Sequence, residues 1–284
     1  MSRWRITVLG NCSVESTSGQ RIKLSQHVWS LLTFLLASPG GLASRGQIAA
    51  ALWPECDEAA ARHCLASAIW RAKTAFKPDD PPLLVDDEQI GLQLDRRFWV
   101  DSIAFDRRVR PVVDQARCLS GAAIVRRLKR AVDSYAGDFA ASVDGEWALI
   151  ERERLKVLQL DALFLLASSY GRAANWPVTI ALTRRLCAAE PLREDAQRLL
   201  MVAFAETGNR GLALKQFEQC RAVLAKELSV EPMPETRELY RKIANASPEQ
   251  PEGAASPRLR SAVLAAKQGV GEALHLLDNA LELS

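Results

Sequence analysis

The second half of the chain is similar to itself at a spacing of 34 residues, and this feature constrains the fold more than any other. The matched positions are Leu166 with Leu200, Tyr170 with Phe204, Asn175 with Asn209 and Ile180 with Leu214. In each unit the aromatic residue ends a first helix, the asparagine lies in the turn, and the aliphatic residue faces back from a second helix. Tetratricopeptide helix-turn-helix units have this period, so the pattern predicts stacked helix pairs. A chance alignment of apolar helices is the alternative.

The first hundred residues predict a different architecture. Short alternating stretches in residues 4–24 predict a small antiparallel sheet, and Ser25 is in position to cap a first helix. A second helix is predicted to begin at Ser44, because Gln47 follows it at the spacing of a capping box. A third helix is predicted over residues 57–76.

A predicted hairpin follows the third helix. Two apolar stretches, Leu83–Val85 and Ile90–Leu94, flank the polar turn Asp86–Gln89. A sheet, three helices and a hairpin in this order are typical of a winged helix-turn-helix, in which the third helix reads DNA and the hairpin is the wing. We therefore expect residues 57–76 to be the recognition helix.

These patterns divide the chain into three parts. Residues 1–99 are the predicted winged helix, and residues 100–246 are a helical domain that opens with a connector at 100–118, in which a basic helical start follows residues 100–105. Residues 247–284 are predicted to be a Pro- and Glu-containing linker and an amphipathic helix, which we expect to dock on the repeats or to pair with a partner. The predicted fold class is mainly α, with an α+β winged helix-turn-helix followed by an all-α tetratricopeptide-like domain.

The predicted helix over residues 57–76 has two different faces. Its apolar face is formed by Leu65, Ile69, Ala72 and Phe76, which are spaced as one stripe along a helix. The candidate DNA-binding residues on the rest of the helix are Arg62, His63, Ala66, Ser67, Trp70, Arg71 and Lys73.

Different contacts are expected from these candidates. Arg62, His63 and Ser67 are close enough on one face to meet base edges. Arg71 and Lys73 are expected to reach phosphates, which would position the domain without reading sequence. The alternative for each polar residue is a solvated surface side chain. Trp70 is expected to pack under the wing, and the alternative is that its ring faces outward for stacking.

Charge excludes one class of nucleic-acid binder. The formal net charge of the chain is +3, and residues 1–100 contain 11 Lys and Arg against 10 Asp and Glu. A protein that coats nucleic acid nonspecifically needs a much larger positive field. Any DNA binding must therefore depend on a local arrangement of side chains.

The sequence also argues against an enzyme or a metalloprotein. It contains no phosphate-binding or dinucleotide-binding glycine motif, no zinc-protease helix motif and no serine-hydrolase motif. The cysteines are scattered and are predicted to be free thiols: Cys12, Cys56, Cys64, Cys118, Cys187 and Cys220. Cys56, His63 and Cys64 lie near one another but offer too few ligands for zinc. We expect no catalytic residues, no cofactor and no metal.

The amino terminus and the apolar runs carry no targeting signal. The first residues lack the apolar core of a signal peptide, and the densest apolar run, residues 31–37, is far too short to cross a membrane. The sequence therefore predicts a cytoplasmic protein.

Four runs resemble, in this order, the bacterial transcriptional activator domain. They are Tyr135–Phe139, Glu146–Leu155, Glu190–Ala196 and Glu227–Pro232. With the predicted winged helix in front, the chain resembles bacterial activators of the antibiotic-regulatory-protein type over residues 4–246. The resemblance implies a response-regulator-type winged helix that binds direct repeats in promoter DNA, and a helical domain that aids self-association. It also implies a homodimer on DNA and recruitment of RNA polymerase holoenzyme.

Two departures from this family leave a second hypothesis open. Ala66 and Trp70 stand where relatives often carry a further basic and a small polar residue, and the wing, represented by Asp87 and Gln89, has an acidic tip. Acidic side chains near phosphates are repelled. The first hypothesis is a sequence-specific DNA-binding activator. The second is a tetratricopeptide-like interaction scaffold whose winged helix no longer binds DNA. A third, weaker one is a ligand-sensing subunit cut from a larger ATPase-bearing regulator.

Overall fold

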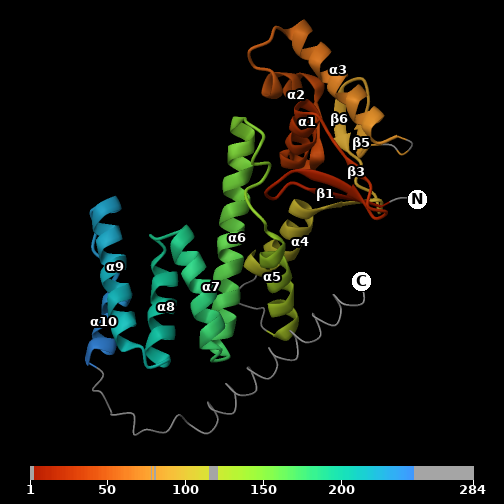
Figure 1. The fold of residues 1–284 in the computed structure, drawn as a ribbon. Coiled ribbons are helices and arrows are strands. Elements are labelled where there is room, and N and C mark those ends of the chain that lie inside the picture. The colour runs from red at the N-terminus through yellow and green to blue at the C-terminus, as the bar shows by residue number, and fades with distance from the viewer. Residues whose placement is uncertain (1–2, 78, 80, 115–120, 246–284) are drawn as a thin grey trace. The chain divides into compact units, whose positions relative to one another are not determined.

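Figure 1 shows two architectures in succession, first sheets with helices and then an array of helices. The computed structural model describes residues 3–77, 79, 81–114 and 121–245. The first part contains β1 (Trp4–Thr7), β2 (Ser13–Ser16), β3 (Arg21–Ile22), α1 (Gln26–Ala37), β4 (Leu42–Ser44), α2 (Arg45–Leu52), α3 (Glu58–Ala75), β5 (Leu83–Val85), β6 (Gln89–Leu92) and β7 (Phe98–Val100). The second contains α4 (Asp101–Asp114), α5 (Ala122–Ser134), α6 (Glu146–Arg172), α7 (Trp176–Ala189), α8 (Glu194–Glu206), α9 (Arg210–Leu228) and α10 (Pro234–Asn245).

The first sheet contains one strand that the sequence did not predict. Its order is β3-β2-β1-β7, and the antiparallel pairing of β1 with β2 and of β2 with β3 is confirmed. β7 pairs parallel to β1, with Val100 opposite Ile6. The prediction of a connector is wrong for residues 100–105, because Val100 ends a strand and α4 begins at Asp101, whereas the helical start predicted after Phe105 is confirmed as part of α4. A parallel pair has no connecting turn, so no local signal announces it.

The wing is a three-stranded sheet of order β4-β6-β5. The predicted hairpin of β5 and β6 is confirmed, and β4, immediately before α2, pairs with β6. Gln89, which the sequence placed in the turn, begins β6 and pairs with Ser44. The wing is therefore tied directly to the start of the helix-turn-helix.

Two predicted helix caps have different outcomes. Ser44 and Gln47 form the complete capping box, with each side chain bonded to the other residue's backbone N–H. Ser25 precedes α1, but its side chain makes no capping hydrogen bond and its oxygen is buried without a partner among the described residues. Ser25 therefore stands at the predicted N-cap position, but the expected capping by its side chain is wrong.

The predicted apolar stripe of α3 is buried. Leu65, Ile69 and Ala72 pack in one core with buried side chains of α1, α2 and the wing. Phe76 instead packs against the aromatic rings of the first sheet. α3 is thus fixed on both sheets of the winged helix through one side.

The 34-residue repeat is confirmed as two helix pairs, α6–α7 and α8–α9, with the same turn. The Asn175 N–H donates to the carbonyl of Tyr170 at 2.9 Å, and the Asn209 N–H donates to that of Phe204 at 2.8 Å. In both turns the residue before the asparagine has a positive φ. The matched residues therefore mark equivalent positions in equivalent turns.

The first sheet is joined to the helical array through a buried carboxylate at the start of α4. Asp101 accepts hydrogen bonds from the backbone N–H groups of Val8, Leu9 and Ser102 at distances of 2.7 to 3.0 Å. Burial raises the pKa of Asp101, although these hydrogen bonds oppose the shift. The Asp101 carboxylate therefore satisfies the backbone N–H groups just after β1, where the hydrogen bonds between strands end.

One arginine holds the other side of this junction. Arg152 of α6 donates to the carbonyls of Phe139 at 2.8 Å, Ala140 at 2.6 Å and Val143. The same loop pairs with the first sheet, because the Ala140 N–H donates to the Val8 carbonyl at 2.7 Å. The run Tyr135–Phe139 therefore leads into the contact between the winged helix and the array. The described residues up to Tyr240 form one compact unit.

Other sequence predictions concern cysteines, membrane spans and the tail. Cys12, Cys56, Cys64, Cys187 and Cys220 are free. In the part of the chain that the structure describes, every helix is too short or too polar to cross a membrane. Cys118 and the predicted linker and helix over 247–284 lie outside the described residues.

Candidate nucleic-acid interface

The orientation of α3 is set by its cap and its packing. The side chain of Asp57 accepts a hydrogen bond from the Ala60 N–H at 2.8 Å, which satisfies one of the free donors at the start of the helix. α2 packs beside α3, so the pair forms the helix-turn-helix. With one side buried, α3 has a single outward face.

The predicted site residues lie along this outward face. Arg62, His63, Ala66, Trp70, Arg71 and Lys73 are exposed, and Ser67 is half-buried. At 3.6 residues per turn, Trp70 lies about 180° around the helix from buried Ala61 and about 160° from buried Ala72. Trp70 therefore lies at the middle of the outward face, and His63 lies about 20° from it.

The prediction that Trp70 packs under the wing is wrong. Its side chain is 66% exposed, whereas Leu65 and Ile69, which share a core with the wing strands, lie on the buried side of the helix. Helical periodicity contained this information, since Trp70 is out of phase with the apolar stripe.

Basic side chains lie at the two margins of the face. Around the helix axis, Arg71 lies about 100° to one side of Trp70, and Lys73 and Arg62 lie about 60° and 80° to the other side. Arg62 is ion-paired with Glu58, and both side chains are largely exposed. Within the described residues, Arg71 and Lys73 have no ion-pair or hydrogen-bond partner for their side chains. The middle of the face is therefore aromatic and its margins are cationic.

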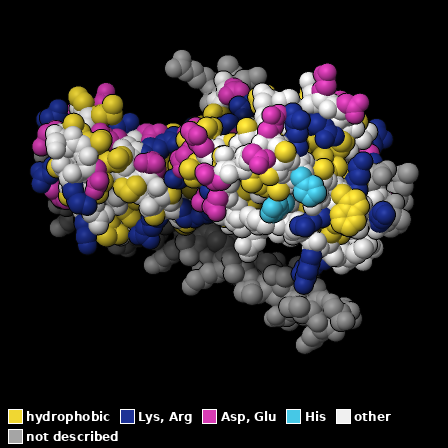
Figure 2. Space-filling view, turned by 90° about the horizontal axis from the view of Figure 1, so that it is seen from above, with side chains coloured by type: hydrophobic (Ala, Val, Ile, Leu, Met, Phe, Trp, Pro, Cys, Tyr) yellow, Lys and Arg dark blue, Asp and Glu magenta, His cyan; other side chains and the backbone are white. Residues whose placement is uncertain are grey.

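The space-filling view agrees with this arrangement. Figure 2 shows dark blue Lys and Arg side chains spread around hydrophobic and histidine side chains over the winged helix, on the right of the view. Asp and Glu side chains lie mainly along its margins. The face is mixed rather than uniformly basic, as the near-neutral composition of residues 1–100 predicts.

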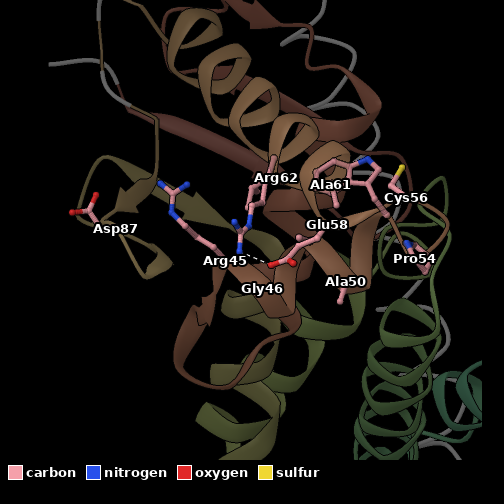
Figure 3. Close-up of a pocket in the computed structure, with 12 residues that line it drawn as sticks. Arg45, Gly46, Ala50, Pro54, Cys56, Glu58, Ala61, Arg62 and Asp87 are labelled. Atoms are coloured by element: carbon pink, nitrogen blue, oxygen red, sulfur yellow. Dashed lines mark hydrogen bonds and ion pairs between the residues drawn. The ribbon is translucent and has the colours of Figure 1, made fainter.

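A groove of about 700 Å³ lies between α2 and α3, with Asp87 of the wing tip at its edge. Figure 3 shows Arg45 of α2 and Arg62 of α3 extending between Glu58 and Asp87. The Arg45 guanidinium donates to the backbone carbonyl of Asp86 at 3.0 Å. Sequence reasoning missed Arg45. Its position as the first residue after the Ser44 cap is the signal that would have found it, because the start of a helix is a common anion contact.

The wing tip is built by its own acidic residue. The Asp86 carboxylate accepts hydrogen bonds from the N–H groups of Glu88 at 2.9 Å and Gln89 at 2.5 Å, which closes the turn. Asp87 is exposed at the tip and lines the groove, whereas Gln89 is exposed within β6. The two wing candidates thus differ in position, because Asp87 lines the groove with Arg45 and Arg62, whereas Gln89 lies in β6.

Comparison with known proteins places this architecture in a family. A model of the bacterial transcriptional activator domain matches residues 100–244, which is just over half of the chain. The chain belongs to the bacterial transcriptional activator domain family. The winged helix in front of that domain makes it a regulator of the antibiotic-regulatory-protein type. This family consists of transcriptional regulators and not of enzymes.

Two regulatory proteins are similar in sequence. The chain is 32% identical to the regulatory protein AfsR of Streptomyces coelicolor over 77% of its own length, and 28% identical to AfsR of Streptomyces griseus over 86%. These matches cover 22% and 25% of the two AfsR proteins. The chain thus spans about a quarter of the length of these relatives.

A solved structure has the same fold. The structure of Mycobacterium tuberculosis EmbR, in complex with a low-affinity phosphopeptide, superposes with a TM-score of 0.75 at 18% identity. The match covers 98% of this chain and 72% of that one. The predicted fold class, a winged helix followed by a tetratricopeptide-like helical domain, is confirmed.

Proposed function

We propose that the chain is a sequence-specific DNA-binding transcriptional activator that binds promoter DNA through the outward face of α3. The observation that carries the proposal is the arrangement of that face, with Trp70 and His63 at its middle and Arg71, Lys73 and Arg62 at its margins. It belongs to a winged helix in a protein of a transcriptional activator family.

An exposed helix face with cationic side chains at both margins is complementary to the DNA major groove. That groove is wide enough for a helix and is bordered by two phosphate backbones. With α3 in the groove, Arg71 faces one backbone and Lys73 and Arg62 face the other, while His63, Ser67 and Trp70 face base edges. Phosphate contacts position the protein and base contacts give specificity. Ala66 keeps the middle of the helix narrow, so that the groove floor is within reach.

The remaining parts of the chain have proposed roles as well. Residues 1–99 are the DNA-binding domain, and residues 100–246 are the activator domain. The helical domain self-associates, giving a homodimer on DNA, and contacts RNA polymerase holoenzyme. Promoter binding places the protein in the cytoplasm. The near-neutral surface supports specific rather than bulk binding.

A mobility-shift titration of the full chain tests the proposal. The probes are DNA fragments from the chain's own gene neighbourhood. The wild type is compared with a double variant that carries both Arg62→Ala and Arg71→Ala. We expect a salt-sensitive, sequence-preferring shift at micromolar protein that the double variant loses. Absence of any such shift for the wild type would rule the proposal out.

The scaffold hypothesis remains as a second candidate because of two observations. The wing tip next to α3 is acidic, with Asp87 exposed, and a groove of about 520 Å³ lies among α7, α8 and α9. In a scaffold this groove would hold a protein partner. A reporter assay in the native host separates the two, since a scaffold keeps its promoter phenotype in the Arg62→Ala, Arg71→Ala variant.

A further inference from the structure

Trp70 is an unusual side chain to leave in water. It is 66% exposed, and it lies on a well-packed helix whose other large apolar side chains are buried. An exposed indole on a rigid surface forgoes a large hydrophobic gain, and tryptophan is enriched where a partner covers it. The position therefore points to a bound state in which an apolar group covers the ring.

The side chains next to Trp70 on α3 leave its indole ring accessible to a partner that approaches the outward face. Ala66 lies one turn before Trp70 on the same face and Thr74 one turn after, and both are small. The Thr74 hydroxyl donates to the Trp70 carbonyl at 2.9 Å, so its side chain is turned back to the helix. Helical side chains tilt toward the amino terminus, which directs the indole over Ala66 rather than toward the cationic margins.

The major groove offers one apolar feature for such a ring. Base edges there present hydrogen-bond donors and acceptors, and only thymine adds a methyl group at C5. A tryptophan at the middle of the α3 face, between cations at the margins, would reach the groove floor where this methyl group projects. The arginine and lysine side chains cannot replace it, because they present polar heads.

We propose that Trp70 determines specificity for thymine by packing its indole ring against a thymine C5 methyl group. This inference rests on the proposed function, because it requires α3 to lie in the major groove. It assigns base reading to an apolar contact, so base reading by α3 does not depend on the further basic residue that relatives often carry in place of Ala66. The hydrogen-bonding candidates His63 and Ser67 then read neighbouring base pairs.

Deletion of single methyl groups from DNA tests this contact. The probe is the shortest duplex from the chain's own gene neighbourhood that the full chain shifts and protects from cleavage. Each protected thymine is replaced in turn by deoxyuridine, which removes the methyl group and keeps the base pair. We expect one or two replacements to lower wild-type affinity about fourfold each, the effect of one buried methyl group.

Variants of Trp70, tested on the same thymine and deoxyuridine probes, show whether this side chain makes the methyl contact. Trp70→Ala should bind the thymine probe more weakly and bind the thymine and uracil probes equally. Trp70→Leu should keep part of the discrimination, because it retains an apolar side chain without the indole N–H. Ile150→Ala is the matched control, since Ile150 is also 66% exposed but lies on α6, and it should discriminate like the wild type.

Three outcomes would overturn the inference in distinguishable ways. Equal wild-type binding to every thymine and uracil probe overturns it and leaves the proposed function intact. Discrimination that persists in a folded Trp70→Ala protein assigns methyl reading to another residue. If no fragment is shifted at all, the proposed function and this inference fail together.

Discussion

The outward face of α3 and the junction around Asp101 and Arg152 use charged side chains in opposite ways. At the junction Arg152 donates to three carbonyls and Asp101 accepts from three N–H groups, so both charges are satisfied inside the chain. On α3, Arg71 and Lys73 extend into solvent without a partner in the described part of the chain. A charge that is satisfied internally holds the fold, whereas an unsatisfied charge on a rigid helix is available to a ligand.

The largest expected effect is at the junction. Arg152→Ala leaves the carbonyls of the loop before α6 without their donor, and we expect the free energy of unfolding to fall by about 3 kcal/mol. Urea denaturation measures this change. Arg185→Ala, an exposed arginine on α7, is the control and should change stability by less than about 0.5 kcal/mol. Equal stability of the two variants would contradict the structural role of Arg152.

The next effect is on α3 and concerns binding instead of stability. Arg71→Ala with Lys73→Ala should lower affinity for the shifted probe at least about tenfold. It should also reduce the slope of log affinity against log salt by about 2, because two phosphate contacts are lost. Gel shifts at several salt concentrations measure both. The matched control is Arg185→Ala with Lys215→Ala, and an unchanged slope in the α3 variant would refute phosphate contact.

A smaller effect concerns the ionisation of Asp101. Burial raises its pKa, so the folded chain binds this proton more tightly than the unfolded chain. The contribution of Asp101 to stability is therefore greatest below the unfolded pKa of about 4 and decreases as pH rises through the folded pKa. Asp101→Asn cannot ionise, so its stability relative to the wild type should increase across this window. Parallel pH curves for the two proteins in urea denaturation would count against the raised pKa.

The smallest expected effect is on DNA affinity and concerns the ion pair of Arg62 with Glu58. Glu58→Gln removes the ion-pair partner of Arg62 and a negative charge beside the groove, and we expect DNA affinity to rise about threefold. Stability should change by less than about 0.5 kcal/mol, because the pair is exposed. Fluorescence anisotropy on the same probe measures the change. Weaker binding would mean that Glu58 orients Arg62 for the contact instead of occupying it.

Sequence patterns predicted what short-range periodicity controls. The Ser44 capping box, the apolar stripe from Leu65 to Phe76, the wing hairpin and the turns at Asn175 and Asn209 are all present. Each depends on residues a few positions apart, whose spacing fixes which side of an element they occupy. The candidate DNA-binding residues of α3 therefore follow from local spacing alone.

Other features depended on partners far apart in the chain. β7 was not predicted because its partner is β1, and Asp101 was not recognised because it bonds to Val8 and Leu9. Arg45 was missed because its contact is the wing. No local pattern encodes these pairings, which form only when the sheets and helices are assembled.

By itself the sequence determined the order of elements, the helix-turn-helix repeat and the residues available on α3. The tertiary structure alone decided which charges near that face are already satisfied, such as Arg62 by Glu58 and Arg45 by the wing carbonyl of Asp86. Leu65, Ile69 and Ala72 are buried in one core with α1, α2 and the wing strands, because packing has to cover this continuous stripe first, and Trp70 on the other side stays in solvent. The core therefore accounts for the buried side of α3, and its exposed side is available to a binding partner.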